Sequence, residues 1–253
     1  MSEARHEAFT GFGGTQLALH RMGAGRPVIL LHGLFSSADM NWIKFGHAQA
    51  LADAGFEALM PDLRAHGASA KPHDADNYPS DVLARDAEAL IAHLGLTDYD
   101  LVGFSLGSRT SVRAIIAGLT PRRLVLGGMG LQGLAGWNSR AAFFLDVIAR
   151  YGTIRPGDPA YMAQQFMKSM SVDREAMRLL LGTMADTAPA DLAAIAMPTL
   201  VLCGAQDDDN GDPDALAEAL PDAIRATIPG THMSSVTQPE LGRELVTFLT
   251  GTD

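Results

Sequence analysis

The sequence has 253 residues, of which 47% are hydrophobic and 19% are charged. This composition is typical of a globular protein and excludes extended disorder, and the length suffices for one hydrophobic core with a small insertion. The net charge is −10, from 19 Lys and Arg against 29 Asp and Glu, and no basic run occurs. Nucleic acids and anionic membranes are therefore not expected partners.

The compartment follows from the cysteine count and from the absence of long apolar runs. The single cysteine, Cys203, cannot form a disulfide within the chain. The N-terminal segment MSEARHEAFT lacks the apolar run of a signal peptide, and no apolar stretch reaches the roughly 18–20 residues that cross a bilayer. We expect a cytoplasmic monomer or homodimer.

Short apolar runs followed by loop residues predict strands that are buried on both faces of a parallel sheet. Segments with helical spacing alternate with these runs, which indicates an α/β fold with a mostly parallel central sheet and helices on both faces. Ligands of such folds bind beyond the carboxyl ends of the strands. The predicted strands are 27–32, 57–62, 99–104, 123–127, 199–203 and 223–228, and the predicted helices are 42–54, 81–94, 106–119, 214–220 and 239–249.

Residues 130–190 interrupt this alternation. Residues 137–151 and 161–184 have the spacing of amphipathic helices, with no strand-like run between them. The order of elements favours a helical cap at 130–190, inserted into a core that comprises residues 1–129 and 191–253. In the alternative interpretation, these helices only cover one face of the sheet.

The segment Gly103-Phe-Ser-Leu-Gly107 matches the GxSxG nucleophile elbow, in which a serine lies on a sharp turn between a strand and a helix. The predicted strand before Ser105 and the predicted helix after it supply that context. Free amides at the start of the helix favour the oxyanion that forms when a serine attacks a carbonyl. Ser105 is the predicted nucleophile, and the amide of Leu106 is one predicted oxyanion donor.

The second oxyanion donor is expected in the loop that follows strand 27–32. The sequence there is His32-Gly33-Leu34-Phe35, and its His-Gly turn suits this role. The amide of Leu34 is the first choice and that of Phe35 is the alternative. His32 is interpreted as a structural residue that anchors the loop.

The base that activates the serine should be a histidine, because its proton affinity lies near neutral pH. Of the eight histidines, only His232 follows the last predicted strand, 223–228, through a short Pro-Gly-Thr turn. This position places it at the catalytic edge and late in the chain, as the order serine, acid, histidine requires.

A carboxylate must orient the base. The loop after strand 123–127 offers no acid, whereas the loop after strand 199–203 offers Asp207 four residues beyond the strand. Asp207 is the predicted orienting acid, and Asp208 and Asp209 are the alternatives. No His, Cys or Asp spacing fits a zinc or calcium site, so we expect no metal and no other cofactor.

Five segments together resemble the α/β-hydrolase fold family, in its serine-nucleophile branch with a small helical cap, over almost the whole chain. The resemblance implies acyl chemistry, since relatives that hydrolyse epoxides or haloalkanes carry an aspartate at the elbow. It also implies that Asp62, Arg64 and His66 organise a loop, with Ala65 at a position where the family usually has glycine. The segments are HGLF at 32–35, DLRAHGAS at 62–69, GFSLG at 103–107, GAQD at 204–207 and GTHM at 230–233.

These observations predict a serine hydrolase that cleaves an ester, as a carboxylesterase does, through an acyl-enzyme intermediate on a small hydrophobic acyl substrate. Within the family, the same triad also serves lactonases, cofactor-free haloperoxidases and enzymes that split a carbon–carbon bond beside a ketone. A receptor that binds a small ligand without turnover is a less favoured alternative. Apolar side chains near the elbow and in the cap are the predicted substrate-binding residues, namely Phe35, Trp42, Phe104, Trp137 and Phe144.

Overall fold

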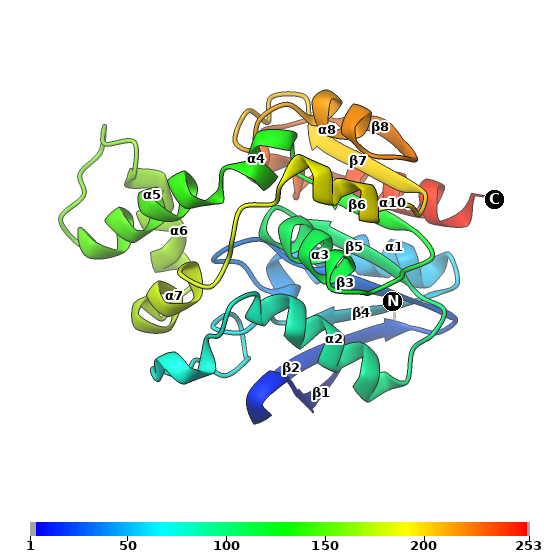
Figure 1. The fold of residues 1–253 in the computed structure, drawn as a ribbon, viewed down its shortest axis with the longest axis horizontal. Coiled ribbons are helices and arrows are strands. Elements are labelled where there is room, and N and C mark those ends of the chain that lie inside the picture. The colour runs from blue at the N-terminus through cyan, green and yellow to red at the C-terminus, as the bar shows by residue number, and fades with distance from the viewer. Residues whose placement is uncertain (1–3, 252–253) are drawn as a thin grey trace.

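One eight-stranded sheet forms the centre of the computed structural model, which describes residues 4–251 (Figure 1). The strand order is β1-β2-β4-β3-β5-β6-β7-β8; β2 runs antiparallel to both of its neighbours, and the other neighbouring pairs are parallel. This confirms the predicted α/β class. The strands are β1 (Arg5–Thr10), β2 (Gln16–Gly23), β3 (Arg26–Leu31), β4 (Phe56–Pro61), β5 (Asp100–Phe104), β6 (Leu124–Gly127), β7 (Thr199–Gly204) and β8 (Ala223–Ile228).

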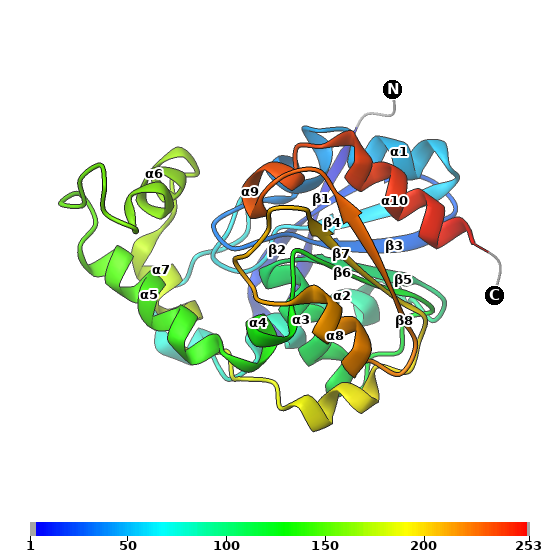
Figure 2. The same ribbon diagram turned by 90° about the horizontal axis from the view of Figure 1, so that it is seen from above.

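Helices cover both faces of the sheet (Figure 2). One layer holds α1 (His47–Asp53), α9 (His232–Ser235) and α10 (Pro239–Thr250), and the other holds α2 (Val82–Leu94), α3 (Leu106–Ile116) and α8 (Pro213–Ala219). Alternate side chains of β3 enter the two cores, with Ile29 and Leu31 on the α2–α3 side and Val28 and Leu30 on the α1–α10 side. Because both faces are buried, the central strands consist of continuous apolar runs.

The predicted strands are all present, with ends that differ by at most one residue. The N-terminal pair β1 and β2 was not predicted, since β1 lies at the sheet edge with all of its residues but Phe9 exposed and has no continuous apolar run. The helix predicted at 42–54 is interrupted: Asp39–Ile43 forms a π-helical turn, and α1 begins only at His47, after Gly46 in the left-handed conformation.

Four α-helices and one 3-10 helix (Pro189–Ala194) lie between β6 and β7; the α-helices are α4 (Leu131–Ala135), α5 (Trp137–Ala149), α6 (Tyr161–Ser169) and α7 (Arg174–Leu181). Helices α5, α6 and α7 form a lobe that projects from the body in both ribbon views (Figures 1 and 2). Their assignment as a substrate cap stays a prediction. Within residues 4–251, none of the helices is both long and apolar enough to cross a membrane.

The single helix predicted at 161–184 is wrong, because the chain turns between α6 and α7. Ser171 adopts a positive φ of 50°, and the amide of Val172 donates back to Met167 O at 3.0 Å, which ends α6. Asp173 then caps α7 by accepting from the amides of Glu175 and Ala176. The apolar spacing continues across this break, so periodicity alone does not reveal it.

A buried arginine ties the loop after β4 to the rest of the core. Arg64 is 0% exposed, and its five N–H donors all have acceptors, which satisfies the requirement for burying a charge. Its partners are the carboxylate of Asp86 on α2 (2.9 and 2.7 Å), Thr15 Oγ1 (2.8 Å) and the carbonyls of Asn77 (2.7 Å) and Phe12 (2.7 Å).

Removing this guanidinium should leave the buried carboxylate of Asp86 without its charged partner. We predict that Arg64→Met lowers the free energy of unfolding by about 3–5 kcal/mol, and that adding Asp86→Leu recovers part of the loss, because no unpaired charge then remains. The measurement is denaturant unfolding. Arg85→Met, at an exposed arginine next to Asp86, is the control and should cost less than about 1 kcal/mol. Equal losses for Arg64→Met and Arg85→Met would contradict this role.

Candidate active site

Ser105 lies on the turn between β5 and α3 in a strained backbone conformation. Its φ is 54° and its ψ is −110°, a region that non-glycine residues rarely occupy. The turn is held from both sides, because the Ser105 amide donates to Gly127 O at 2.8 Å and the Arg109 amide donates to Ser105 O at 3.1 Å. These two hydrogen bonds hold Ser105 in its strained conformation, and its hydroxyl therefore projects beyond the end of the sheet.

Both glycines of the elbow are required by close backbone contacts. A Cβ at Gly103 would lie 2.4 Å from the backbone of Gly107 and Ser108, and a Cβ at Gly107 would lie 2.0 Å from Leu31 O. Real Cβ atoms do not approach backbone this closely, so any larger residue would force α3 away from β5 and β3. The GxSxG pattern is thus explained by packing at this turn.

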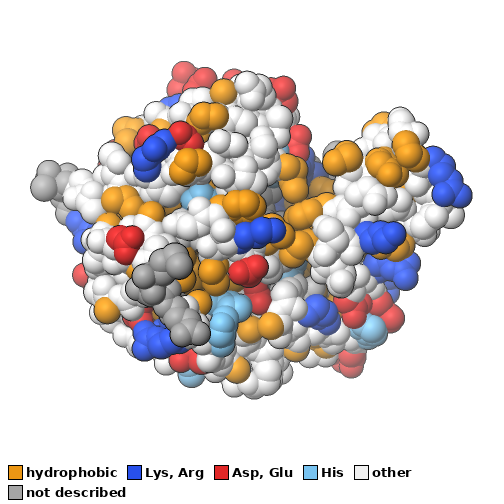
Figure 3. Space-filling view, turned by 180° about the vertical axis from the view of Figure 1, so that it is seen from behind, with side chains coloured by type: hydrophobic (Ala, Val, Ile, Leu, Met, Phe, Trp, Pro, Cys, Tyr) orange, Lys and Arg blue, Asp and Glu red, His pale blue; other side chains and the backbone are white. Residues whose placement is uncertain are grey.

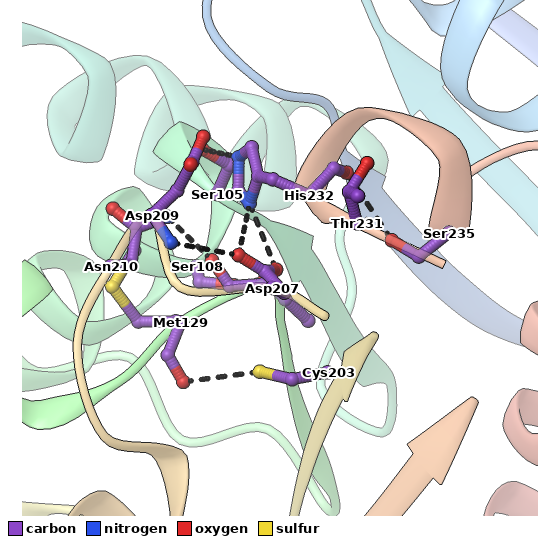
Figure 4. A network of polar contacts seen from close by, with 12 residues as sticks. Ser105, Ser108, Met129, Cys203, Asp207, Asp209, Asn210, Thr231, His232 and Ser235 are labelled. Carbon is purple, nitrogen blue, oxygen red and sulfur yellow. Dashed lines mark hydrogen bonds and ion pairs between the residues drawn. The ribbon is translucent and has the colours of Figure 1, made fainter. Parts of the chain in front are cut away.

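The structure brings the three predicted catalytic side chains together (Figure 4). His232 Nε2 lies 3.0 Å from Ser105 Oγ, and His232 Nδ1 lies 2.9 and 3.1 Å from the two carboxylate oxygens of Asp207. An ionised carboxylate only accepts, so Nδ1–H donates to Asp207 and Nε2 accepts from the Ser105 hydroxyl. The side chains of His232 and Asp207 are 9% and 2% exposed.

Local capping and backbone bonds fix the histidine and the acid. His232 begins α9, whose N-terminus is closed by a capping box between Thr231 and Ser234. Asp207 accepts from the amide of Asp209 at 3.2 Å and donates its own amide to Gly204 O at 3.1 Å. The two loops are joined because the amide of Gln206 donates to Gly230 O at 3.0 Å.

The loop after β3 presents a free amide beside the serine. Within residues 4–251, no hydrogen bond engages the amide of Leu34, whereas the amide of Phe35 donates to His66 Nε2 at 3.1 Å. The geometry therefore keeps Leu34 available as an oxyanion donor and removes Phe35, the alternative. Leu106 is the first residue of α3, so its amide has no acceptor in a preceding helical turn.

Two buried histidines support this loop without facing the serine. His32 and His66 each donate from Nδ1 and accept at Nε2, and their rings meet edge to face at 5.0 Å. Their role is structural, as the sequence suggested for His32. The carbonyl acceptors are Gly33 (2.8 Å) and Arg64 (2.9 Å), and the amide donors are Leu63 (3.0 Å) and Phe35 (3.1 Å).

Asp62 is the third structural residue of this region. Burial by itself would raise the pKa of Asp62, but the hydrogen bond from His20 at 3.1 Å and the amides of Ala68 and Ala38 at 2.8 Å hold it well below its usual range. Ala65 has a φ of 68°, the left-handed conformation that glycine adopts without strain. This conformation accounts for the glycine that relatives usually carry at that position.

The predicted substrate-binding residues fall into two groups. Phe35 and Phe144 lie next to the predicted oxyanion loop, with ring centres 5.3 Å apart in an edge-to-face pair. Trp42, Trp137 and Phe104 are buried, as is Phe35, and the ring of Phe104 lies 5.3 Å from that of His232; a contact of these residues with substrate stays a prediction. Figure 3 shows the surface hollowed between the lobe and the body, with hydrophobic side chains on its walls.

The structure adds residues that no motif indicated. Arg109 on α3 is buried, donates to Gly133 O and Ala185 O, and lies over the ring of Trp137, so it holds both chain segments that lead to the lobe. Asn41 Oδ1 accepts from the amide of Gly33 at 3.1 Å and thereby fixes the loop beside Ser105. These roles depend on contacts between distant segments, which local sequence patterns do not encode.

Cys203 is buried in β7 behind the site. Burial raises the pKa of the Cys203 thiol to about 11, and its Sγ contacts Met129 O at 3.5 Å (Figure 4). A neutral, enclosed thiol is a poor nucleophile. Its position in the buried strand β7 is typical of a cysteine that packs as a small hydrophobic residue.

Comparison with known proteins identifies the family. The profile of the α/β hydrolase fold matches residues 26–118. A non-heme haloperoxidase of Rhodococcus erythropolis is 30% identical over 231 residues, which cover 79% of this chain and 81% of that protein. The chain therefore belongs to the α/β-hydrolase fold family.

Solved structures share the fold over nearly the whole chain. The esterase RhEst1 from Rhodococcus sp. ECU1013 superposes with a TM-score of 0.75 at 24% identity, covering 98% of this chain and 99% of that one. An enol-lactonase from Burkholderia xenovorans LB400 superposes with a TM-score of 0.76 at 22% identity, covering 97% and 100%. At these identities the likeness concerns the fold.

The buried histidine pair should make the protein sensitive to acid. Burial lowers the pKa of His66 from 6.5 to about 3 and also lowers the pKa of His32. Between pH 6.5 and about 3, the imidazole of His66 is protonated in the unfolded chain but stays neutral in the folded chain. The free energy of unfolding should therefore fall as the pH decreases through this range. We predict a shallower pH dependence for His66→Gln in denaturant titrations across this range. An unchanged slope in that variant would contradict the assignment.

Proposed function

We propose that this protein is a serine hydrolase that cleaves esters of small, largely apolar acyl groups. The observation that carries the proposal is the continuous contact from Ser105 Oγ through His232 to Asp207, built from three different strand ends. This arrangement is the one that activates a hydroxyl for attack on a carbonyl. The predicted cap, the cytoplasmic location and the monomeric or homodimeric state belong to the same proposal.

The proposed reaction has two steps. His232 Nε2 takes the proton of Ser105 as Oγ bonds to the ester carbonyl carbon, and the amides of Leu34 and Leu106 hold the oxyanion. Collapse of the tetrahedral intermediate breaks the bond to the alcohol, which leaves with the proton from His232. Water then attacks the acyl-enzyme in the same way and releases the acid, which regenerates Ser105.

Asp207 supports both steps by fixing the tautomer of His232. Its two carboxylate oxygens lie near Nδ1, so the proton stays there and Nε2 remains the acceptor. The acid also stabilises the imidazolium that forms in each step. Burial of both side chains excludes water that would weaken this attraction.

Apolar side chains support the choice of acyl substrate. Phe35 contacts Phe144, whose ring in turn lies 5.2 Å from the ring of Phe143, and Phe143 is 40% exposed. This series of rings leads from the predicted oxyanion loop toward the surface, and it suits a hydrocarbon chain or ring better than a sugar. The related haloperoxidase and the enol-lactonase with the same fold make peroxidation and lactone cleavage the alternatives to be tested beside esters.

The test is turnover of p-nitrophenyl esters from acetate to decanoate, together with labelling by a fluorophosphonate probe. Ser105→Ala should lower kcat by roughly 10⁴-fold or more and abolish labelling, while thermal unfolding stays near that of the wild type. Ser80→Ala, which removes an exposed hydroxyl, is the matched control and should retain both activities.

The outcomes separate the alternatives. Ester turnover that persists in Ser105→Ala would overturn the assignment of the nucleophile. Labelling of the wild type without turnover of any ester would overturn the ester proposal and direct the same test to lactones, to peroxidation and to carbon–carbon bonds beside a ketone.

A further inference from the structure

Arg140 on α5 places a cation next to the acid loop of the candidate site. Its Nη1 donates to the carbonyl of Asp209, two residues beyond Asp207, and its guanidinium lies 5.7 Å from the ring centre of Phe144. Phe144 in turn contacts Phe35 beside the predicted oxyanion loop. Arg140 therefore lies between the aromatic series and the loop that carries the acid.

This guanidinium is partly exposed to water, and among the described residues no acid lies within hydrogen-bond distance of it. Its side chain is 26% exposed, and burial lowers the pKa of Arg140, an effect that the charges of Asp209 and Asp207 partly offset. Among residues 4–251, its nearest carboxylate oxygen is that of Asp209, 4.0 Å from Nη2, which is beyond hydrogen-bond distance. The Nε–H donor also has no acceptor within the described residues.

Arginines of restricted exposure in this chain differ in their partners: Arg109 donates to backbone carbonyls, whereas Arg64 and Arg113 have close carboxylates. Arg64 lies 2.7 Å from Asp86, and Arg113 lies 2.6 Å from Asp81. Arg140 has no acid within hydrogen-bond distance among the described residues, so its guanidinium can bind an incoming anion. The Nε and Nη2 edge of Arg140 has the fork geometry that accepts a carboxylate through two parallel hydrogen bonds.

The overall charge makes a local cation necessary for any anionic substrate. The chain carries a net charge of −10, and Asp207, Asp208 and Asp209 add three acids beside the site. Such a field repels anions at long range, so an anionic acyl group needs a specific positive contact to bind. Arg140 is positioned to provide it.

We infer that Arg140 binds a second carboxylate on the acyl group, so that the substrates are monoesters of dicarboxylic acids with an apolar chain between the two carboxyl groups. The inference rests on the proposed ester hydrolysis and narrows its substrate class. Arg140 acts in binding and does not take part in proton transfer.

The experiment compares p-nitrophenyl hexanoate with the p-nitrophenyl monoester of adipic acid, which differ only in a terminal methyl or carboxylate group. The octanoate and the suberic acid monoester form a second, longer pair. For the wild type, we expect kcat/KM to be higher for the anionic member of at least one pair. Arg140→Gln should raise KM for that monoester about 10- to 100-fold, the usual loss for a hydrogen bond to a charged group, and leave kcat/KM for the neutral ester within about threefold.

Two further variants distinguish a role of Arg140 in substrate binding from a purely structural role. Arg140→Lys keeps the charge and should recover part of the affinity for the anionic ester. Lys168→Gln, at an exposed lysine on α6, removes one charge from the lobe and should leave both esters unaffected. Parallel losses on both esters in Arg140→Gln would show that Arg140 only holds the acid loop, which would overturn the inference.

The same experiment distinguishes a failure of the inference about Arg140 from a failure of the proposed ester hydrolysis. Turnover of neutral esters with no preference for either anionic ester in the wild type overturns the inference and leaves the serine hydrolase standing. Absence of turnover on all four esters overturns both.

Discussion

The close contact between the start of α3 and the end of β3 is the constraint on which the rest of the site depends. Gly107 lies so near Leu31 O that a Cβ there would approach it to 2.0 Å, and Leu31 pairs with Gly103 in the parallel ladder. This contact sets Ser105 beside the Gly33–Leu34 loop. The strained φ of Ser105 is held in place because α3 cannot move away without losing its packing on both strands.

The hydrogen-bonded register of the parallel strands also fixes where the other two predicted catalytic residues lie. Phe104 pairs with Gly127, Gly127 pairs with Leu202, and Gly204 pairs with Ile228, so the ends of β5, β6, β7 and β8 lie at one edge in fixed register. The loops that carry Asp207 and His232 leave from that edge and are joined by backbone hydrogen bonds. The sheet thus sets the positions from which the loops leave, and side chains such as Asn41 and His66 then hold the loop after β3 in place.

The sequence allowed much of this to be predicted, for a physical reason. Strands buried on both faces leave continuous apolar runs, and catalytic residues directly follow those runs, so Ser105, Asp207 and His232 could be placed by position. The N-terminal strands β1 and β2 lack such runs and were missed. Apolarity does not distinguish a pocket wall from a core, so the predicted substrate contacts of Phe35, Trp42, Phe104 and Trp137, all of them buried, stay predictions.

Arg109 and Arg140 escaped prediction because their partners lie far away in the sequence. Arg109 bonds the carbonyls of Gly133 and Ala185, and Arg140 bonds that of Asp209, so only the folded chain brings these groups together. Between them they link the helical lobe to α3 and to the acid loop. The lobe is thus attached to the same elements that carry the nucleophile and its acid, which supports its proposed role above the site.

The covalent intermediate offers the most direct test of the central claim that Ser105 carries the acyl group. Wild-type protein is mixed with p-nitrophenyl hexanoate, quenched in acid within milliseconds, digested and analysed by mass spectrometry. The account predicts a hexanoyl group on the peptide that contains Ser105, together with a burst of p-nitrophenol close to one equivalent of protein wherever deacylation is slow. A burst of p-nitrophenol without acylated Ser105, or an acyl group found on another residue, would contradict it.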